Sequence, residues 1–456
     1  IGLNALPPAP HPTRLIFSGR ATSPPNYEHM LITCECQEAI QFVEPWIVRG
    51  PGKTESRGKC YGGSRVDELG SDPSQASQTS KVATIAAAHA VHDTYSSFLP
   101  PLLPVFIEKL SLAKAEAGLL TVFLQGPSLL QPVIGHLGDR FDLRIAVVLT
   151  PVLTAACMCL LGVAPVYAII ALLLATAGVS SAVLHSLAPV IAGRLSRNRL
   201  GFGMGFWMVG GELGRTLGPI ILVSAIAVLG LEGLPWLMAG GVGASALLYF
   251  GVRGTSQVRS GPADTSDFSR AVQSMRNLLF PLSAVVVFRS FMMAAFATYL
   301  PVFLREEGAS LWFAGASLSV LEAGGVIGAL VGGSASDVLG RRRVLAISFL
   351  LTPVLMFALV YTTGWWRLPL LLPLGFAGLM ATPVIMASVQ ESAPEHRAFA
   401  NGINMALNFI LRAQIDDLVG ALAYRLGMRP AFLDCAAQGL LGTPFIFRLP
   451  GKKHGS

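Results

Sequence analysis

Long apolar stretches alternate with short polar segments along most of the chain. Twelve of them approach or exceed the roughly 20 residues that an α-helix needs to cross a bilayer. They are Val82–Ile107, Glu116–Gly135, Ile145–Ala164, Pro165–Ala192, Gly201–Leu229, Leu234–Val252, Leu279–Leu304, Trp312–Ala335, Val344–Thr362, Leu368–Val389, Phe399–Ala423 and Met428–Leu449. These runs are continuous and do not alternate as the strands of a membrane barrel do. The pattern therefore predicts an all-α membrane protein with twelve transmembrane helices.

A polar segment, Arg253–Asn277, divides the twelve stretches into two groups of six. We expect a first six-helix half over residues 82–252, a cytoplasmic linker over 253–278, a second half over 279–449 and a C-terminal tail over 450–456. Residues 1–81 show no apolar periodicity and lack the apolar core of a signal peptide. We interpret them as a disordered or untranslated extension, with a translation start at Val66 as one hypothesis.

Composition supports the membrane prediction and limits the function. Charged residues make up 13% of the chain and the mean hydropathy is +0.59, whereas soluble domains carry about 25% charged residues. Most arginines fall in the linker and in the loops expected after even-numbered spans, which predicts that both chain ends are cytoplasmic and that the protein lies in the cell inner membrane. The net charge of +7 thus leaves no basic face for nucleic acid. The six cysteines form no metal-binding pattern, so we expect neither a metal nor a cofactor.

Two charged loops repeat at equivalent places. The sequence "GHLGDRFDLR", starting at Gly135, follows the second span, and "GSASDVLGRR", starting at Gly333, follows the eighth. An offset of 198 residues, from 135 to 333, also aligns Asp139 with Asp337. Two halves with matching loops indicate a parallel repeat, which is typical of transporters whose halves rock about a central site.

The first loop resembles the signature loop of the major facilitator superfamily, Gly-x-Leu-x-Asp-Arg-x-x-x-Arg. It departs from that pattern at Asp142, where the family prefers glycine. The resemblance in layout covers Val82 to about Leu449 and implies that the loops latch the cytoplasmic face shut during alternating access. The residues that would form this latch are Gly135, Asp139, Arg140, Arg144, Gly333, Asp337, Arg341 and Arg342.

A narrower resemblance rests on three spans. The first contains "AHAVHDTYSSFLPPLLPVF", the fourth "GVSSAVLHSLAP" and the fifth "MVGGELGRTLGP". They resemble the fosmidomycin-resistance branch, whose members are proton-driven drug exporters. Gly205, Gly214, Gly218 and Pro219 resemble the family's antiporter motif without its trailing glycine pair, and a helix packing role for these small residues is an open alternative.

Charged side chains inside the spans mark a candidate site, because each costs about 2.5–3.5 kcal/mol at the centre of a bilayer. Asp93 lies one helical turn after His89 and next to His92, and we interpret these three residues as the proton-coupling site. The residues expected to line the substrate cavity are His185, Glu212, Arg215, Arg289 and Glu322.

The sequence contains no catalytic constellation and no Walker loop, so we expect a secondary transporter rather than an enzyme. Our prediction is a monomeric, proton-coupled antiporter that exports small drug-like or anionic molecules by alternating access. Its partners would be the substrate, protons and the lipid bilayer. Two alternatives stay open, which are proton-coupled uptake of a small metabolite and a transporter-like receptor or sensor.

Overall fold

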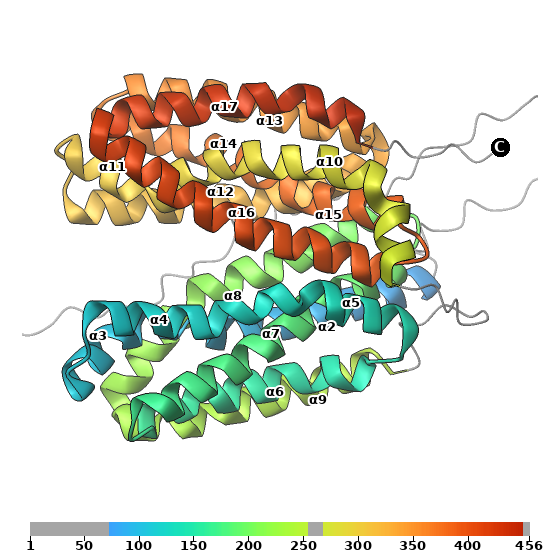
Figure 1. Ribbon diagram of the computed structural model, residues 1–456, viewed down its shortest axis with the longest axis vertical. Helices are drawn as coiled ribbons and strands as arrows, with labels where there is room; N and C mark the ends of the chain where they lie inside the picture. Colours follow the sequence, from blue (N-terminus) through green and yellow to red (C-terminus); the bar gives the residue numbers. More distant parts are fainter. Residues whose placement is uncertain (1–72, 254–267, 450–456) are drawn as a thin grey trace, which may run out of the picture. The chain divides into compact units, whose positions relative to one another are not determined.

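The computed structural model describes residues 73–253 and 268–449, and the regular structure in these two ranges is helical (Figure 1). The predictions for residues 1–72, for most of the linker and for the tail lie outside the described residues. Helix α2 begins at Pro73, before the predicted start at Val82, and α10 begins at Phe268, inside the predicted linker.

The first half is built from helices α2 to α9. Their bounds are α2 Pro73–Ser96, α3 Leu99–Leu110, α4 Lys114–Gln125, α5 Gln131–Arg140, α6 Arg144–Leu160, α7 Tyr167–Leu195, α8 Leu200–Leu229 and α9 Met238–Gly251. The predicted second span is broken between α4 and α5 by a 3₁₀ segment, Gly126–Leu130, with Pro127 in its first turn. Proline has no N–H to donate to the preceding turn, which explains why the α-helix stops there.

The second half repeats this arrangement. Its helices are α10 Phe268–Met293, α11 Leu300–Glu306, α12 Leu311–Leu339, α13 Arg341–Tyr361, α14 Arg367–Leu379, α15 Ala381–Ser392, α16 Arg397–Leu426 and α17 Met428–Arg448. A π-helical segment, Ala294–Thr298, separates α10 from α11. Helices α14 and α15 are separated at Met380, where Pro383 removes a backbone hydrogen bond.

Within the described ranges, nine helical segments are long and apolar enough to cross a membrane. They correspond to the second through the tenth predicted spans. The first, eleventh and twelfth, which contain α2, α16 and α17, do not meet the criterion because polar and charged side chains interrupt them. The count of twelve spans and the cytoplasmic position of both ends therefore stay predictions.

Each half has its own apolar core, and large apolar side chains also cover the outside. Leu102 and Phe106 are buried in the first half, and Phe303 and Phe349 in the second. On the outside, Val228 is 81% exposed. So much exposed apolar surface is costly in water and suits contact with lipid.

The two halves contact each other mainly through α5 with α16 and through α8 with α12. Both contacts depend on glycine. A Cβ on Gly135 would lie 2.2 Å from the carbonyl oxygen of Ala398, and one on Gly201 would lie 2.1 Å from that of Gly333. These close approaches occur at the end of the helices that carries the two signature loops, so the halves meet tightly there.

Candidate functional site

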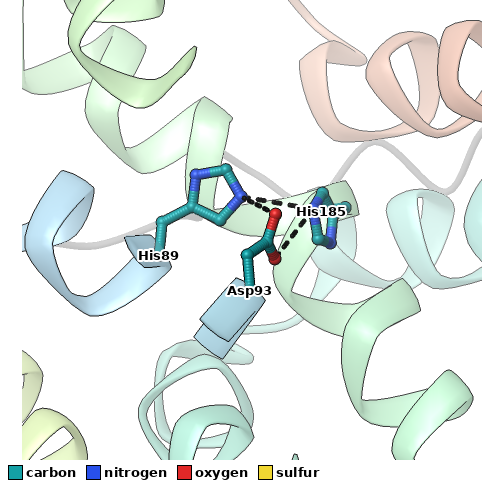
Figure 2. Close-up of side chains that lie close together, drawn as sticks. All are labelled: His89, Asp93 and His185. Carbon is teal, nitrogen blue, oxygen red and sulfur yellow. Dashed lines mark hydrogen bonds and ion pairs between the residues drawn. The ribbon is translucent and has the colours of Figure 1, made fainter. Parts of the chain in front are cut away.

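A buried cluster of histidines surrounds Asp93 (Figure 2). His89 lies one turn before Asp93 on α2, and its Nε2 is 3.3 Å from the Oδ2 of Asp93. The Nδ1 of His92 lies 3.0 Å from Oδ1. His185, on α7, brings its Nε2 to 3.6 Å from Oδ1 and to 3.2 Å from the Nε2 of His89. The structure therefore places His185, expected to contact substrate, together with the three residues expected to bind protons.

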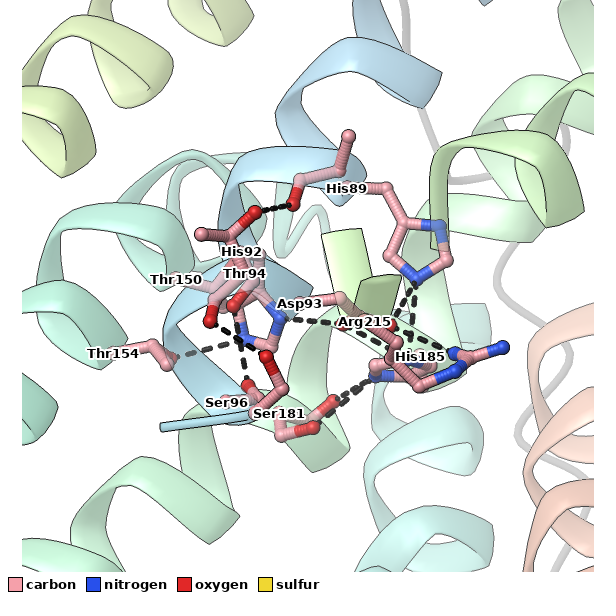
Figure 3. Close-up of polar contacts among 12 residues, drawn as sticks. His89, His92, Asp93, Thr94, Ser96, Thr150, Thr154, Ser181, His185 and Arg215 are labelled. Carbon is pink, nitrogen blue, oxygen red and sulfur yellow. Dashed lines mark hydrogen bonds and ion pairs between the residues drawn. The ribbon is translucent and has the colours of Figure 1, made fainter. Parts of the chain in front are cut away.

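Helix α8 adds an arginine and a second carboxylate to the cluster. Arg215 donates from NH1 to the Oδ2 of Asp93 at 3.0 Å (Figure 3). Its NH2 pairs with Glu212 in the same helix. Asp93 is almost fully buried, whereas the side chain of Arg215 is 47% exposed. Arg215 thus connects a buried carboxylate to a more open region.

The glycines of α8 explain why α2 lies so close. A Cβ on Gly214 would lie 2.3 Å from the carbonyl oxygen of Ala90, and one on Gly218 would lie 2.4 Å from that of Thr94. On another side of α8, a Cβ on Gly205 would lie 2.9 Å from the carbonyl oxygen of Ala329 in α12. Pro219 lies within α8. The antiporter-like residues thus allow α8 to pack closely against one helix of each half.

Two of the histidine rings are oriented by hydrogen-bond partners that the sequence did not indicate. His89 stacks on Trp207 with 3.6 Å between ring centroids, and its Nδ1 lies 2.9 Å from the carbonyl oxygen of that residue. The Nε2 of His92 lies 2.9 Å from the hydroxyl of Thr154, which donates to Ser180. These partners sit on α6, α7 and α8, and no local sequence signal relates them to α2.

The donor atoms of this cluster are also of types that metal ions take. One atom each from His89, Asp93 and His185 lie within 4.8 Å of one another. However, the guanidinium of Arg215 already supplies a positive charge to the Asp93 carboxylate at 3.0 Å, and it opposes a second cation beside the same oxygen. The contacts therefore favour protons over a metal ion as occupants.

A cavity of about 400 Å³ lies between the two halves, and the cluster forms part of its wall. The wall from the first half includes His89, His185, Trp207, Glu212 and Arg215. The wall from the second half includes Arg289, Thr382, Asn404, Asn408 and Arg412. Four of the five residues expected to line the cavity therefore do so. Glu322, on α12, is not part of the cavity lining.

Arg289 is a buried cation in the wall of this cavity. Its exposed fraction is 9%, and it donates to the hydroxyl of Thr382. Its Nε has no hydrogen-bond partner, and no ion pair joins Arg289 to a carboxylate of the described residues. An uncompensated charge in a cavity wall costs free energy that an anionic ligand would recover. This wall of the cavity is therefore suited to a negatively charged group.

The aspartates of the two repeated loops contact opposite halves in the same way. Asp139, on α5, accepts hydrogen bonds from the backbone N–H groups of Ala398 and Phe399 at 3.0 and 2.9 Å, at the start of α16. Asp337, on α12, accepts from Gly201 and Phe202 at 2.9 Å each, at the start of α8. A carboxylate at a helix N-terminus satisfies free N–H groups and interacts favourably with the helix dipole.

The arginines of these loops differ between the copies. Arg341 pairs with Asp337 at 2.7 Å and with Glu391 at 2.8 Å, whereas Arg342 donates to the carbonyl oxygen of Leu449. In the first loop Arg144 pairs with Asp142 at 3.3 Å, and Arg140 ends α5. The hydrogen bonds from backbone N–H groups to the two aspartates are therefore contacts between halves that both copies share.

Comparison with known proteins identifies the family. The family model described as Major Facilitator Superfamily matches residues 85–413. The chain belongs to this superfamily. It is accordingly a multi-pass membrane transporter.

Individual relatives agree with this assignment. The chain is 25% identical over 364 residues to the fosmidomycin resistance protein of Escherichia coli (strain K12), which covers 78% of this chain and 89% of that protein. The resemblance to the fosmidomycin-resistance branch is thereby confirmed. Among solved structures, the fold matches the E. coli fucose:proton symporter FucP with a TM-score of 0.67, at 16% identity over 81% of this chain and 98% of that one. It also matches the human organic anion transporter MFSD10 with a TM-score of 0.65, at 16% identity over 82% of this chain and 100% of that one.

Proposed function

We propose that this superfamily member is a proton-coupled antiporter that exports small drug-like or anionic molecules by alternating access. We further propose that it acts as a monomer in the cell inner membrane, with twelve spans and both ends in the cytoplasm. One observation carries the proposal, which is that the buried cluster around Asp93 forms part of the wall of the cavity between the halves.

Proton coupling is assigned to Asp93, His89 and His92. Imidazoles gain and lose protons near neutral pH, and ionisable side chains held inside a membrane span mark proton relays. His89 and Arg215 belong both to this cluster and to the cavity wall. A bound substrate and a bound proton would therefore contact the same side chains, which is the arrangement that exchange requires.

The substrate is assigned to the cavity lined by His185, Glu212, Arg215 and Arg289. The free guanidinium nitrogen of Arg289 supports an anionic group on the cargo. The Escherichia coli relative is named for fosmidomycin resistance, which supports a drug-like cargo. Glu322 is left out of this assignment, although its carboxylate is close enough to interact electrostatically with Glu212 and Arg215.

Alternating access is assigned to the two loops and to α8. In this structure, Asp139 and Asp337 hold the loop-bearing ends of the halves together. Opening of that end requires these four hydrogen bonds to break. Because α8 packs on both α2 and α12, movement between the halves would change the contacts between α8 and Asp93 on α2.

Transport in proteoliposomes tests the proposal. The compounds, with fosmidomycin among them, are offered to wild-type protein, to Asp93→Asn and to Asp417→Asn as a matched change on an exposed residue of α16. We expect protons to move opposite to a compound with wild type and Asp417→Asn, and neither to move with Asp93→Asn. Compound movement without proton flux would refute the coupling. Protons that move with the compound would instead support uptake, and binding without movement would support a receptor.

A further inference from the structure

Some close contacts in the cluster around Asp93 join two atoms that can only accept hydrogen bonds unless an extra proton is bound. Main-chain carbonyl oxygens can only accept, so a ring nitrogen that contacts one must carry the hydrogen. The Nδ1 of His89 contacts the carbonyl of Trp207, and the Nδ1 of His185 contacts the carbonyl of Ser181, both at 2.9 Å. When the ring is neutral, the Nε2 of each histidine then carries a lone pair and no hydrogen, so it can only accept a hydrogen bond.

These two lone pairs face each other. The Nε2 atoms of His89 and His185 are 3.2 Å apart, and the oxygens of Asp93 lie 3.3 and 3.6 Å from them. All of these atoms are acceptors when both rings are neutral. One proton added to either Nε2 converts the contact between the rings into a hydrogen bond and gives the carboxylate a charged partner.

The contact between Asp93 and His92 lacks a hydrogen for a separate reason. Ser180 donates its only hydroxyl hydrogen to the carbonyl of Thr150, so Thr154 donates to Ser180 and must accept from the Nε2 of His92. The Nδ1 of a neutral His92 then carries a lone pair and lies 3.0 Å from the Oδ1 of Asp93, which is also an acceptor. A second proton is needed here, on the ring or on the carboxyl group.

From these hydrogen-bond partners we infer that the cluster has two positions for a proton. The proton exchanged with the cavity is shared between the Nε2 of His89 and the Nε2 of His185. This inference rests on the proposed proton coupling and adds a carrier to it. On entry, hydronium in the cavity gives up its proton, so one O–H bond breaks as one N–H bond forms, and on exit the N–H bond breaks as water takes the proton back. The proton between Asp93 and His92 stays inside, because neither residue lines the cavity.

The charges around the pair fit this assignment. Asp93 and His92 face it from α2, and Glu212 and Arg215 from α8. Helix α6 contributes the hydroxyl of Thr154, and Arg289 and Arg412 of the second half face the pair across the cavity. Glu322 lies outside the cavity lining but is close enough to interact electrostatically with Glu212 and Arg215. Arg215 occupies Oδ2 of Asp93, so the proton of the pair has the ring nitrogens as its nearest acceptors.

Trp207 provides a direct readout of this proton. Its indole stacks on the His89 ring at an interplanar angle of 9°. A positive charge that appears on the stacked ring forms a cation–π contact and alters the fluorescence of the indole. The signal of Trp207 alone is the difference between the protein and its Trp207→Phe counterpart.

We would titrate this difference signal from about pH 5 to pH 9 in purified full-length protein, without substrate. We expect a one-proton transition in wild type. His185→Gln places an amide opposite His89, which can donate to its Nε2, so the transition should vanish or shift by about one pH unit or more. His136→Gln, whose ring packs on Phe399 outside the cluster, should retain the transition. His92→Gln tests whether the titrating proton belongs instead to the contact between Asp93 and His92. Elution profile and melting temperature identify any variant that fails to fold.

The outcomes separate this inference from the proposed function. If His185→Gln titrates as wild type does, the shared proton is refuted, even where liposomes show proton-coupled transport. If only His92→Gln abolishes the transition, the exchanged proton belongs to the Asp93–His92 contact and the inference is likewise overturned. If the transition depends on His185 as expected but transport is uncoupled from protons, the inference holds for proton binding and the antiporter proposal fails.

Discussion

Replacement of Gly214 by alanine tests whether close packing of α8 on α2 positions the proton site. The new Cβ would lie 2.3 Å from the carbonyl oxygen of Ala90 and 2.9 Å from the Cβ of Asp93. Ordinary van der Waals contact begins at 3.4 Å, so the first contact is about 1.1 Å too short. The obstacle is backbone, which cannot rotate away as a side chain can. The two helices must therefore separate by roughly 1 Å.

This separation has an energetic and a functional consequence. Overpacking of this kind costs about 1–3 kcal/mol, and each kcal/mol lowers the melting temperature by roughly 2–4 °C in domains of 150–250 residues. The 3.0 Å contact between Arg215 and Asp93 joins the same two helices and would lengthen toward 4 Å. We therefore expect a melting temperature several degrees lower and a loss of substrate-driven proton movement.

The matched control is Gly243→Ala in α9, where an added Cβ meets nothing within 4 Å. Alanine is more stable than glycine inside a helix by roughly 0.5–1 kcal/mol, so this variant should melt at the wild-type temperature or slightly above it. Both variants are compared by thermal unfolding in detergent and by proton movement in proteoliposomes. If Gly214→Ala melts and transports as Gly243→Ala does, the packing argument is wrong.

Three further changes give distinct results. Asp139→Asn removes the negative charge at the start of α16 and should weaken the loop-end closure by about 0.3–1 kcal/mol. This appears as a longer spin-label distance across that end, whereas Asp142→Asn should leave the distance unchanged. Arg289→Gln should weaken binding of anionic compounds at least tenfold by calorimetry and spare neutral ones, and equal loss for both would contradict an anion contact. Hydrogen bonds from Arg429 hold the pKa of the Glu307 carboxyl below its usual range. The ionised carboxylate therefore stabilises the fold above about pH 4.5, and this stabilisation is lost as the pH falls through the lowered pKa of the folded state. Glu307→Gln should therefore melt below wild type at pH 7, the gap should close in acid, and a gap independent of pH would count against the ion pair.

Local patterns in the sequence were sufficient for much of the fold. Helical segments lie at all the predicted apolar stretches, because a helix satisfies its own backbone and its apolar length depends only on neighbouring residues. The repeat of the loop at Gly135 and Gly333 was visible for the same reason. Helix boundaries were less accurate, as at Pro127 and Met380, where a break depends on one or two residues.

The candidate site was only partly within reach of the sequence. Spacing by one turn was enough to place His89 beside Asp93, and three residues of separation were enough to pair Glu212 with Arg215. The sequence could not show that His185 would join them, since α7 comes about 90 residues later in the chain. Nor could it show that Glu322 would lie outside the cavity lining.

The sequence by itself thus determined the helices, the repeat and the pairs of residues within one helix, because these follow from interactions over a few residues. Only the tertiary structure decided which side chains meet across helices, such as Trp207 with His89 or Asp139 with the start of α16. Those meetings depend on which helix faces pack together, and here glycine positions such as Gly214 set how closely they approach. Close packing between distant segments is a property of the whole fold, and no short window of sequence contains it.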